Sequence, residues 1–227
     1  MVRRLKPEIR ETYDRIKDQL FRDFVELVPD DNVKTGHYLP HHPVAKDSVT
    51  TPIRMVYDCS CKTGANPSLN DCLETGPPLL NDLASIMLRF RVHNIAISAD
   101  IEKAFLNVGL ESDDRPYTKF LWLSDPDDPE SSFNVYQFKV VLFGASCSPF
   151  ILNATIKHHL EINASDVAND ITKNIYVDNL ISGCPDDKIT MDYYTEANKL
   201  MKSSGFHLRE WSSNSQGLHD LARMITP

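Results

Sequence analysis

The 227-residue sequence lacks any long apolar run, and this absence limits the classes of protein to which it can belong. Its apolar stretches are much shorter than the roughly 20 residues that a helix needs to cross a bilayer, so we expect no membrane role. The N-terminal segment is charged throughout and does not contain the apolar core of a signal peptide. These features predict an intracellular, cytoplasmic protein that is not secreted.

The sequence also lacks a disulfide framework, because its five cysteines are odd in number and irregularly spaced. Cys59 and Cys61 could bind a metal ion together with His41 and His42. A structural zinc site, however, usually shows two ligand pairs at wider spacing. Free thiols in a reducing compartment are the favoured interpretation.

An excess of basic residues is missing too, since 24 Lys and Arg face 32 Asp and Glu, for a net charge of −8. A large exposed nucleic-acid surface should be basic. Basic residues such as Arg89, Arg91 and Lys119 do not form a dense stripe. A nucleic-acid role would therefore need local clusters or basic parts that lie outside this sequence.

The sequence does contain a mixture of helical and strand patterns, within a composition that is ordinary for a folded protein, 41% hydrophobic and 25% charged. Strand pairs interspersed with helices favour an α+β fold over a doubly wound parallel sheet. Helical periodicity predicts helices over 8–28, 79–91, 148–160 and 187–205. Apolar alternation predicts strands over 37–44, 51–58, 94–100, 117–123, 133–143 and 173–184, with a weak one over 206–211.

Two aspartates stand out against these apolar strands. Asp100 ends one strand pattern, and Asp178 lies in the predicted turn between two others. Asp and Asn tolerate a positive φ, so an ordinary hairpin turn would explain Asp178 and Asn179 alone. If the strands are neighbours in one sheet, however, the two carboxylates converge and repel each other unless a divalent cation neutralises them. Mg²⁺ suits such oxygen ligands, which is the chemistry of a nucleotide polymerase.

At this point the sequence resembles the reverse transcriptase domain of retroelements, most closely that of BEL/Pao-type LTR retrotransposons. The segments that carry the resemblance follow the order of the family and extend from about residue 36 to 215. They are HYLPHHPV, TTPIRMVYD, SLNDCLETGP, RFR, ADIEKAFLNV, FLW, VLFGASCSPFILN, YVDNLISG and GFHLREWSSN.

The resemblance implies reverse transcriptase fingers and palm, with an antiparallel palm sheet, packed helices and no thumb. It implies an N-terminal helical segment over 1–30, fingers mainly over 31–93 and 115–140, and a palm mainly over 94–114 and 141–227. It further implies an RNA-directed DNA polymerase that uses two Mg²⁺ ions, or Mn²⁺. Its partners would be an RNA template, a DNA primer, a dNTP and the rest of a Pol polyprotein with thumb, RNase H and integrase. A virus-like particle is an alternative location to the free cytoplasm.

In the palm, the resemblance assigns both metal ions to Asp100 and Asp178, with help from the carbonyl group of Ile101. Phe105 would lie against the sugar 2′ position and exclude ribonucleotides by its bulk. A core aromatic residue on a helix is the alternative for Phe105. Tyr176 is expected to be an accessory residue of the turn.

In the fingers, the resemblance assigns the dNTP triphosphate to Arg54, whose guanidinium suits phosphate oxygens, and to Lys46 as a second contact. A solvated surface charge is the alternative for both. In the predicted palm, Phe143 would contact the nucleotide and Gly144 would lie beneath the nascent base pair, where glycine allows close backbone approach.

The sequence departs from the family at two positions. Asn179 stands where the family usually has a second aspartate of the turn, and it removes one charge while keeping a carbonyl oxygen. Glu210 stands where a lysine often serves as proton donor to pyrophosphate, and neighbouring Arg209 is a poor donor because it keeps its charge. A catalytically inactive retroelement fragment, at most a nucleic-acid-binding module, is therefore the alternative function. An unrelated α+β interaction protein would leave the ordered motifs unexplained.

Overall fold

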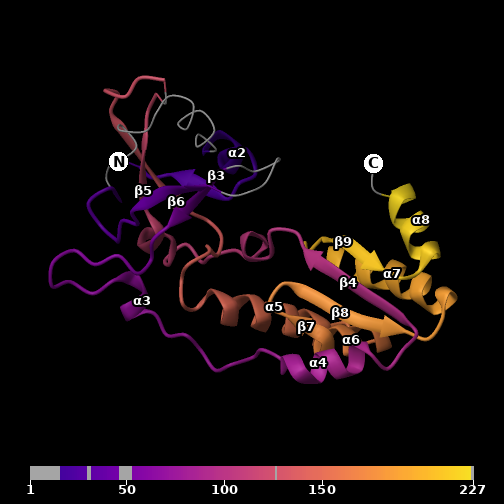
Figure 1. Cartoon of the computed structure of the whole chain (residues 1–227). Coiled ribbons are helices and arrows are strands. Elements are labelled where there is room, and N and C mark those ends of the chain that lie inside the picture. Colours follow the sequence, from indigo (N-terminus) through magenta and orange to yellow (C-terminus); the bar gives the residue numbers. More distant parts are fainter. Residues whose placement is uncertain (1–15, 30–31, 46–52, 126, 226–227) are drawn as a thin grey trace. The chain divides into compact units, whose positions relative to one another are not determined.

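The computed structural model describes residues 16–29, 32–45, 53–125 and 127–225, and these form a mixed α+β fold with antiparallel sheets (Figure 1). The predicted fold class is therefore confirmed. The described residues fall into two compact units, and each is considered by itself. The first comprises Met1–Thr75 with Val108–Ser148, and the second comprises Gly76–Asn107 with Pro149–Pro227.

The first unit contains two small antiparallel sheets. One has the strand order β1 (Val25–Leu27), β6 (Phe133–Phe138), β5 (Phe120–Leu123), and the other pairs β2 (His41–Ala45) with β3 (Ile53–Tyr57). The β2–β3 pair confirms the predicted strands in this region. Short helical turns complete the unit: α2 (Ile16–Phe21), α3 (Leu69–Cys72) and the 3₁₀ helix η4 (Arg115–Thr118).

Aromatic side chains fill the interior of the first unit. The rings of Tyr57 and Phe138 meet edge to face with centroids 4.7 Å apart, and Tyr57 and Phe120 meet in the same way at 5.0 Å. Trp122 and His41 complete the cluster, and all five side chains are buried. Such pairs contribute about 0.5–1.5 kcal/mol each beyond the burial of their area, so this cluster is a main source of the unit's stability.

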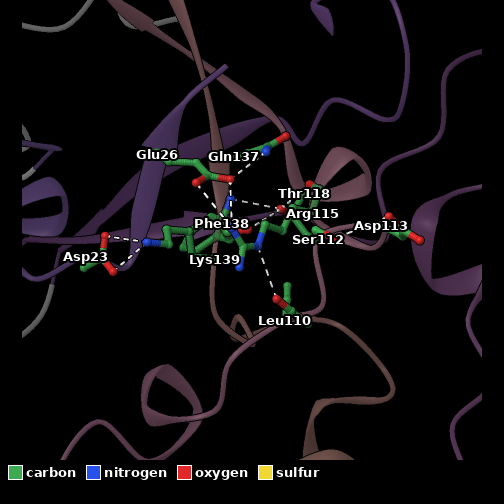
Figure 2. A network of polar contacts seen from close by, with 10 residues as sticks. All are labelled: Asp23, Glu26, Leu110, Ser112, Asp113, Arg115, Thr118, Gln137, Phe138 and Lys139. Atoms are coloured by element: carbon green, nitrogen blue, oxygen red, sulfur yellow. Dashed lines mark hydrogen bonds and ion pairs between the residues drawn. The ribbon is translucent and has the colours of Figure 1, made fainter. Parts of the chain in front are cut away.

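Charged side chains on the edge of the first unit are paired, as Figure 2 shows. Glu26 on β1 accepts hydrogen bonds from Arg115 Nη1 at 3.2 Å and from Gln137 Nε2 at 2.8 Å. Lys139 Nζ donates to both carboxylate oxygens of Asp23 at 2.6 Å. These contacts connect β1 and the residues before it to β6 and the residues after it. They also pair the positive charges of Arg115 and Lys139 with carboxylates of the same unit.

The predicted helix over 8–28 is wrong in its second part. Residues 1–15 lie outside the described residues, and the helix that follows ends at Phe21. Asp23 then takes a φ of 60°, which interrupts a helix. Val25–Leu27 instead pairs with β6 and buries Val25. Strand pairing has overridden a local helical pattern.

The second unit is built on a four-stranded antiparallel sheet. Its strand order is β7 (Ile175–Tyr176), β8 (Asn179–Cys184), β4 (Ile95–Ile101), β9 (Leu208–Ser213). Along β4, Ile95, Ile97, Ala99 and Ile101 are buried, while Ser98 and Asp100 between them are half-buried. Because strand side chains alternate between faces, Asp100 lies on the face opposite to this apolar row.

Helices cover the sheet of the second unit. Helices α4 (Leu83–Phe90), α6 (Asp166–Asn174) and α7 (Asp187–Lys202) pack against β8, and α7 and α8 (Gln216–Ile225) pack against β9 (Figure 1). The predicted helices over 79–91, 148–160 and 187–205 are present with adjusted bounds, whereas α6 and α8 were not predicted. Gly205 has a φ of 83°, as expected beyond the end of α7. The remaining helices are the 3₁₀ helix η3 (Ala104–Asn107) and α5 (Ser148–Ile162).

A polar network joins three of these elements beneath the sheet. Asp170 on α6 accepts hydrogen bonds through Oδ2 from Ser182 Oγ on β8 at 2.7 Å and from Tyr193 Oη on α7 at 2.8 Å. Its Oδ1 accepts a third from Asn174 Nδ2 at 2.8 Å. Burial and the nearby Asp170 carboxylate raise the pKa of Tyr193 well above its ordinary value, so the phenol remains a donor. The network fixes β8, the strand that follows Asp178.

Candidate active site

Asp100 and Asp178 come from neighbouring strands of the second unit. Asp100 lies opposite Asn179 in the β4–β8 register, and the backbone amide of Ile101 donates to the carbonyl oxygen of Asp178 at 2.8 Å. The two strands are therefore neighbours in one sheet, as the expected convergence of the two aspartates requires.

The turn that carries Asp178 has an unusual backbone. Val177 and Asp178 connect β7 to β8, and the positive φ of this turn, 55°, falls on Val177. A β-branched residue is unfavourable in this conformation, which costs about 1–3 kcal/mol. Asp178 and Asn179 do not supply the positive φ, so the ordinary-turn explanation does not account for these two residues.

The surroundings of Asp178 disfavour its ionised form when no cation is bound. Burial raises the pKa of the Asp178 carboxyl, and the nearby charge of Asp100 raises it further, against a backbone hydrogen bond that lowers it. Asn179 Nδ2 donates to Asp178 Oδ1 at 3.1 Å. The site thus holds negative charge that a cation would stabilise.

One cationic group already lies beside Asp100. Arg209 faces Asp100 across the β4–β9 pair, and its Nε donates to Asp100 Oδ1 at 3.0 Å. This hydrogen bond and the charge of Asp100 raise the pKa of the guanidinium above its ordinary value. From the sequence, Arg209 was predicted only to be a poor proton donor, and its contact with Asp100 was not predicted. The weak strand pattern over 206–211 was the one signal that could have pointed to it.

Three other predicted palm residues belong to the second unit: Ile101 and Phe105, which lie close in sequence to Asp100, and Tyr176 in β7. Ile101 is buried at the end of β4, and its amide makes the bond to Asp178 described above. Phe105 is buried in η3, after a tight turn in which Lys103 has a φ of 50°. Burial of Phe105 agrees with the core alternative, and its contact with a sugar stays a prediction. Tyr176 pairs with Asn179 in the β7–β8 ladder.

The remaining predicted nucleotide-binding residues belong to the first unit. Lys46 lies outside the described residues. Arg54 is described by its backbone, which pairs with Val44 in the β2–β3 hairpin. Phe143 is about half exposed, and Gly144 follows it with a φ of 100°.

Asn70 holds the Gly144 turn, a role that the sequence analysis did not identify. Its Nδ2 donates to the carbonyl oxygen of Gly144 at 2.9 Å, and its Oδ1 accepts from the amide of Ser146 at 2.8 Å. A Cβ on Gly144 would lie 3.1 Å from the carbonyl oxygen of Tyr57. Glycine is therefore required here both by its φ and by the close backbone approach.

The zinc alternative finds no support in the geometry. All five cysteines are free, and burial raises the pKa of the Cys59 thiol to about 11, which disfavours the thiolate that zinc needs. His41 Nε2 donates to the carbonyl oxygen of Leu121 at 2.9 Å. Among the described residues, no group of three or more His, Cys, Asp or Glu side chains is arranged to hold a metal ion. The candidate metal ligands are the two carboxylates of the second unit.

The first unit also has a surface pocket of about 390 Å³, lined by residues that include His37, Pro40 and Leu121. His41 and Cys61 of the zinc alternative line it, but none of the residues that the resemblance assigns to the polymerase site does. In the part of the chain that the structure describes, no helix is both long and apolar enough to span a bilayer.

The mixed α+β fold with antiparallel sheets matches the fingers and palm region of reverse transcriptases. A family model described as "Reverse transcriptase (RNA-dependent DNA polymerase)" matches residues 60–211, which is most of the sequence. The chain therefore belongs to the reverse transcriptase family.

A solved structure with a similar fold is the protease–reverse transcriptase of prototype foamy virus, determined as a selenomethionine-labelled CSH mutant. It matches with a TM-score of 0.66 and 16% sequence identity over 90% of this chain. The match covers 24% of the viral chain, so this chain spans about a quarter of its length. At this identity the likeness shows the fold alone. A comparison with curated proteins found no match.

Proposed function

We propose that this chain is the fingers and palm of an RNA-directed DNA polymerase from a BEL/Pao-type LTR retrotransposon. The observation that carries the proposal is the pairing of β4 with β8, which brings Asp100 beside the Asp178 turn in a member of the reverse transcriptase family. We assign the first unit to the fingers and the second to the palm. This moves residues 76–93 from the predicted fingers to the palm, and residues 108–114 and 141–148 from the predicted palm to the fingers. A thumb, RNase H and integrase would belong to the same polyprotein.

In this proposal Asp100 and Asp178 hold two Mg²⁺ ions, or Mn²⁺, with the carbonyl group of Ile101 as a further ligand. The donor set fits, because carboxylate and carbonyl oxygens are the ligands that Mg²⁺ prefers. Burial, and then the nearby charge of Asp100, raise the pKa of Asp178, and a cation would stabilise the ionised carboxylate. When bound, the two ions would activate the primer 3′-hydroxyl and stabilise the pyrophosphate that leaves the dNTP.

The residues of the chain would position the reactants. Phe105 would exclude a 2′-hydroxyl, Arg54 and Lys46 would bind the triphosphate, and Phe143 and Gly144 would support the nascent base pair. The turn at Gly144 is held in place by Asn70, which fits a surface that must keep its shape. Tyr176 would stabilise the turn through the β7–β8 ladder.

Asn179 favours a second candidate function, a catalytically inactive fragment of the same family. Its amide donates to Asp178 Oδ1, where a second carboxylate would add negative charge for metal binding. Nucleic-acid binding without polymerisation would remain in this case.

Primer extension on an RNA template distinguishes the two candidates. The purified chain is given a DNA primer, dNTPs and either Mg²⁺ or Mn²⁺, beside Asp100→Asn and Asn179→Asp variants. Extension by the parent that disappears in Asp100→Asn supports the polymerase. A folded parent and a folded Asn179→Asp variant that both fail to extend the primer would favour the inactive fragment.

A further inference from the structure

Arg209 contacts both Asp100 and its own neighbour Glu210, and neither Arg209 nor Glu210 has a part in the proposed function. Arg209 Nε bonds to Asp100 Oδ1 at 3.0 Å, while Arg209 Nη2 lies 3.8 Å from Glu210 Oε1. One guanidinium therefore contacts two carboxylates at once, one of them a proposed metal ligand.

A β-bulge produces this arrangement. Asp100 pairs with Arg209 and Ser98 pairs with Ser212, so β9 has one extra residue opposite this part of β4. Glu210 takes a φ of 52° at the bulge. Successive strand residues normally point to opposite faces, and a bulge redirects one of them. The bulge explains how Glu210 comes close to the guanidinium of its own neighbour.

The exposure of the three side chains allows Arg209 to move. The side chain of Arg209 is 47% exposed and that of Glu210 is 72% exposed, whereas that of Asp100 is 27% exposed. Arg209 can thus leave Asp100 without opening the core. An ion pair at this exposure is weak, so a divalent cation can displace it.

We propose that Arg209 competes with the divalent cation for Asp100 and turns to Glu210 when the cation binds. Arg209 is then a positioning residue that sets the metal affinity of the site, and Glu210 is its second partner. This inference rests on the proposed function, because it takes Asp100 as a metal ligand. In the metal-free chain, the guanidinium supplies a positive charge beside Asp100 and holds its side chain by the hydrogen bond to Oδ1.

The two residues should affect metal affinity in opposite directions. Arg209→Gln removes the competitor and its repulsion of the cation, so Mn²⁺ should bind about fivefold to tenfold more tightly at low ionic strength. Glu210→Gln removes the second partner, so Mn²⁺ should bind about twofold to threefold more weakly. That weakening should be largely absent when Arg209→Gln is already present, because the two residues act as a pair.

The test is a titration of the full chain with Mn²⁺, followed by the electron paramagnetic resonance signal of free Mn²⁺. Lys202→Gln is the matched control, since it removes one exposed positive charge from α7 of the same unit. Arg209→Lys keeps the charge and should bind Mn²⁺ nearly as the parent does. Circular dichroism checks that each variant is folded.

The expected result is tighter binding in Arg209→Gln than in Lys202→Gln, with the effect of Glu210→Gln dependent on Arg209. Equal shifts in Arg209→Gln and Lys202→Gln would overturn the inference and leave the metal site intact. Unchanged Mn²⁺ binding in Asp100→Asn would instead show that the proposed metal site itself is wrong, and the inference would fail with it.

Discussion

The backbone amide of Ile101 donates a hydrogen bond to the carbonyl oxygen of Asp178, at 2.8 Å. This single bond links the residue after Asp100 to the hairpin turn of the next strand. It forms although the turn places Val177 at a φ of 55°, which β-branched residues avoid. The sheet therefore holds Asp178 beside Asp100 at a cost in local backbone energy, which is a common feature of functional sites.

Asp178→Asn should abolish RNA-templated primer extension, with a loss of about 100-fold or more, because it removes the charge of a proposed metal ligand. Asp192→Asn is the matched control, since Asp192 is exposed on α7 of the same unit, and its activity should stay within about twofold of the parent. Initial rates of extension at saturating Mg²⁺ measure both. Equal losses in the two variants would mean that Asp178 has no special role.

The same substitution should stabilise the metal-free chain at neutral pH. The folded-state pKa of Asp178 is raised, chiefly by burial and then by Asp100, so its ionised form costs stability above that pKa. Asp178→Asn removes this cost, and we expect a gain below about 1 kcal/mol in the free energy of unfolding at pH 7.

The gain should shrink as the pH falls through the raised pKa and vanish below about pH 3, where the carboxyl is mostly protonated in both the folded and unfolded states. Urea unfolding in EDTA at pH 7 and at pH 3 measures it. A gain of the same size at both pH values would assign the effect to packing rather than to charge.

Much of the second unit could be predicted from the sequence. The alternation of Ile95, Ile97 and Ala99 predicted β4, and the apolar residues on both sides of Asp178 predicted the hairpin. These patterns are local and repeat with the period of the strand, so they can be recognised without knowledge of the tertiary structure.

The contacts that complete the site could not be predicted in this way. The contact between Arg209 and Asp100 depends on a one-residue bulge at Glu210, and a shift of one residue would turn the side chains of a strand to the opposite face. Val25–Leu27 was predicted as helix from its local apolar spacing. Its pairing with β6, whose residues are distant in sequence, cannot be recognised from that spacing. The secondary structure of such segments is determined by tertiary strand pairing, which local propensity does not reveal.

Asp170→Ala should destabilise the second unit by about 3 kcal/mol, because it leaves the hydroxyl groups of Ser182 and Tyr193 without their acceptor. Tyr193→Phe removes one donor and leaves the carboxylate with other partners, so its cost should be nearer 1 kcal/mol. Urea unfolding gives both values. If Asp170→Ala costs no more than Tyr193→Phe, the network does not fix β8 as we infer.

Gly144→Ala should destabilise the first unit by about 2 kcal/mol or more. Alanine is strained at a φ of 100°, and its Cβ would lie 3.1 Å from the carbonyl oxygen of Tyr57. Gly109→Ala is the matched control in the same unit, because a Cβ there meets no atom within 4 Å, and its effect should stay within about 0.5 kcal/mol. Thermal unfolding followed by circular dichroism compares the two variants with the parent. A similar small change in both would show that the Asn70-bound turn can adopt another conformation, and that the chain does not require glycine at this position.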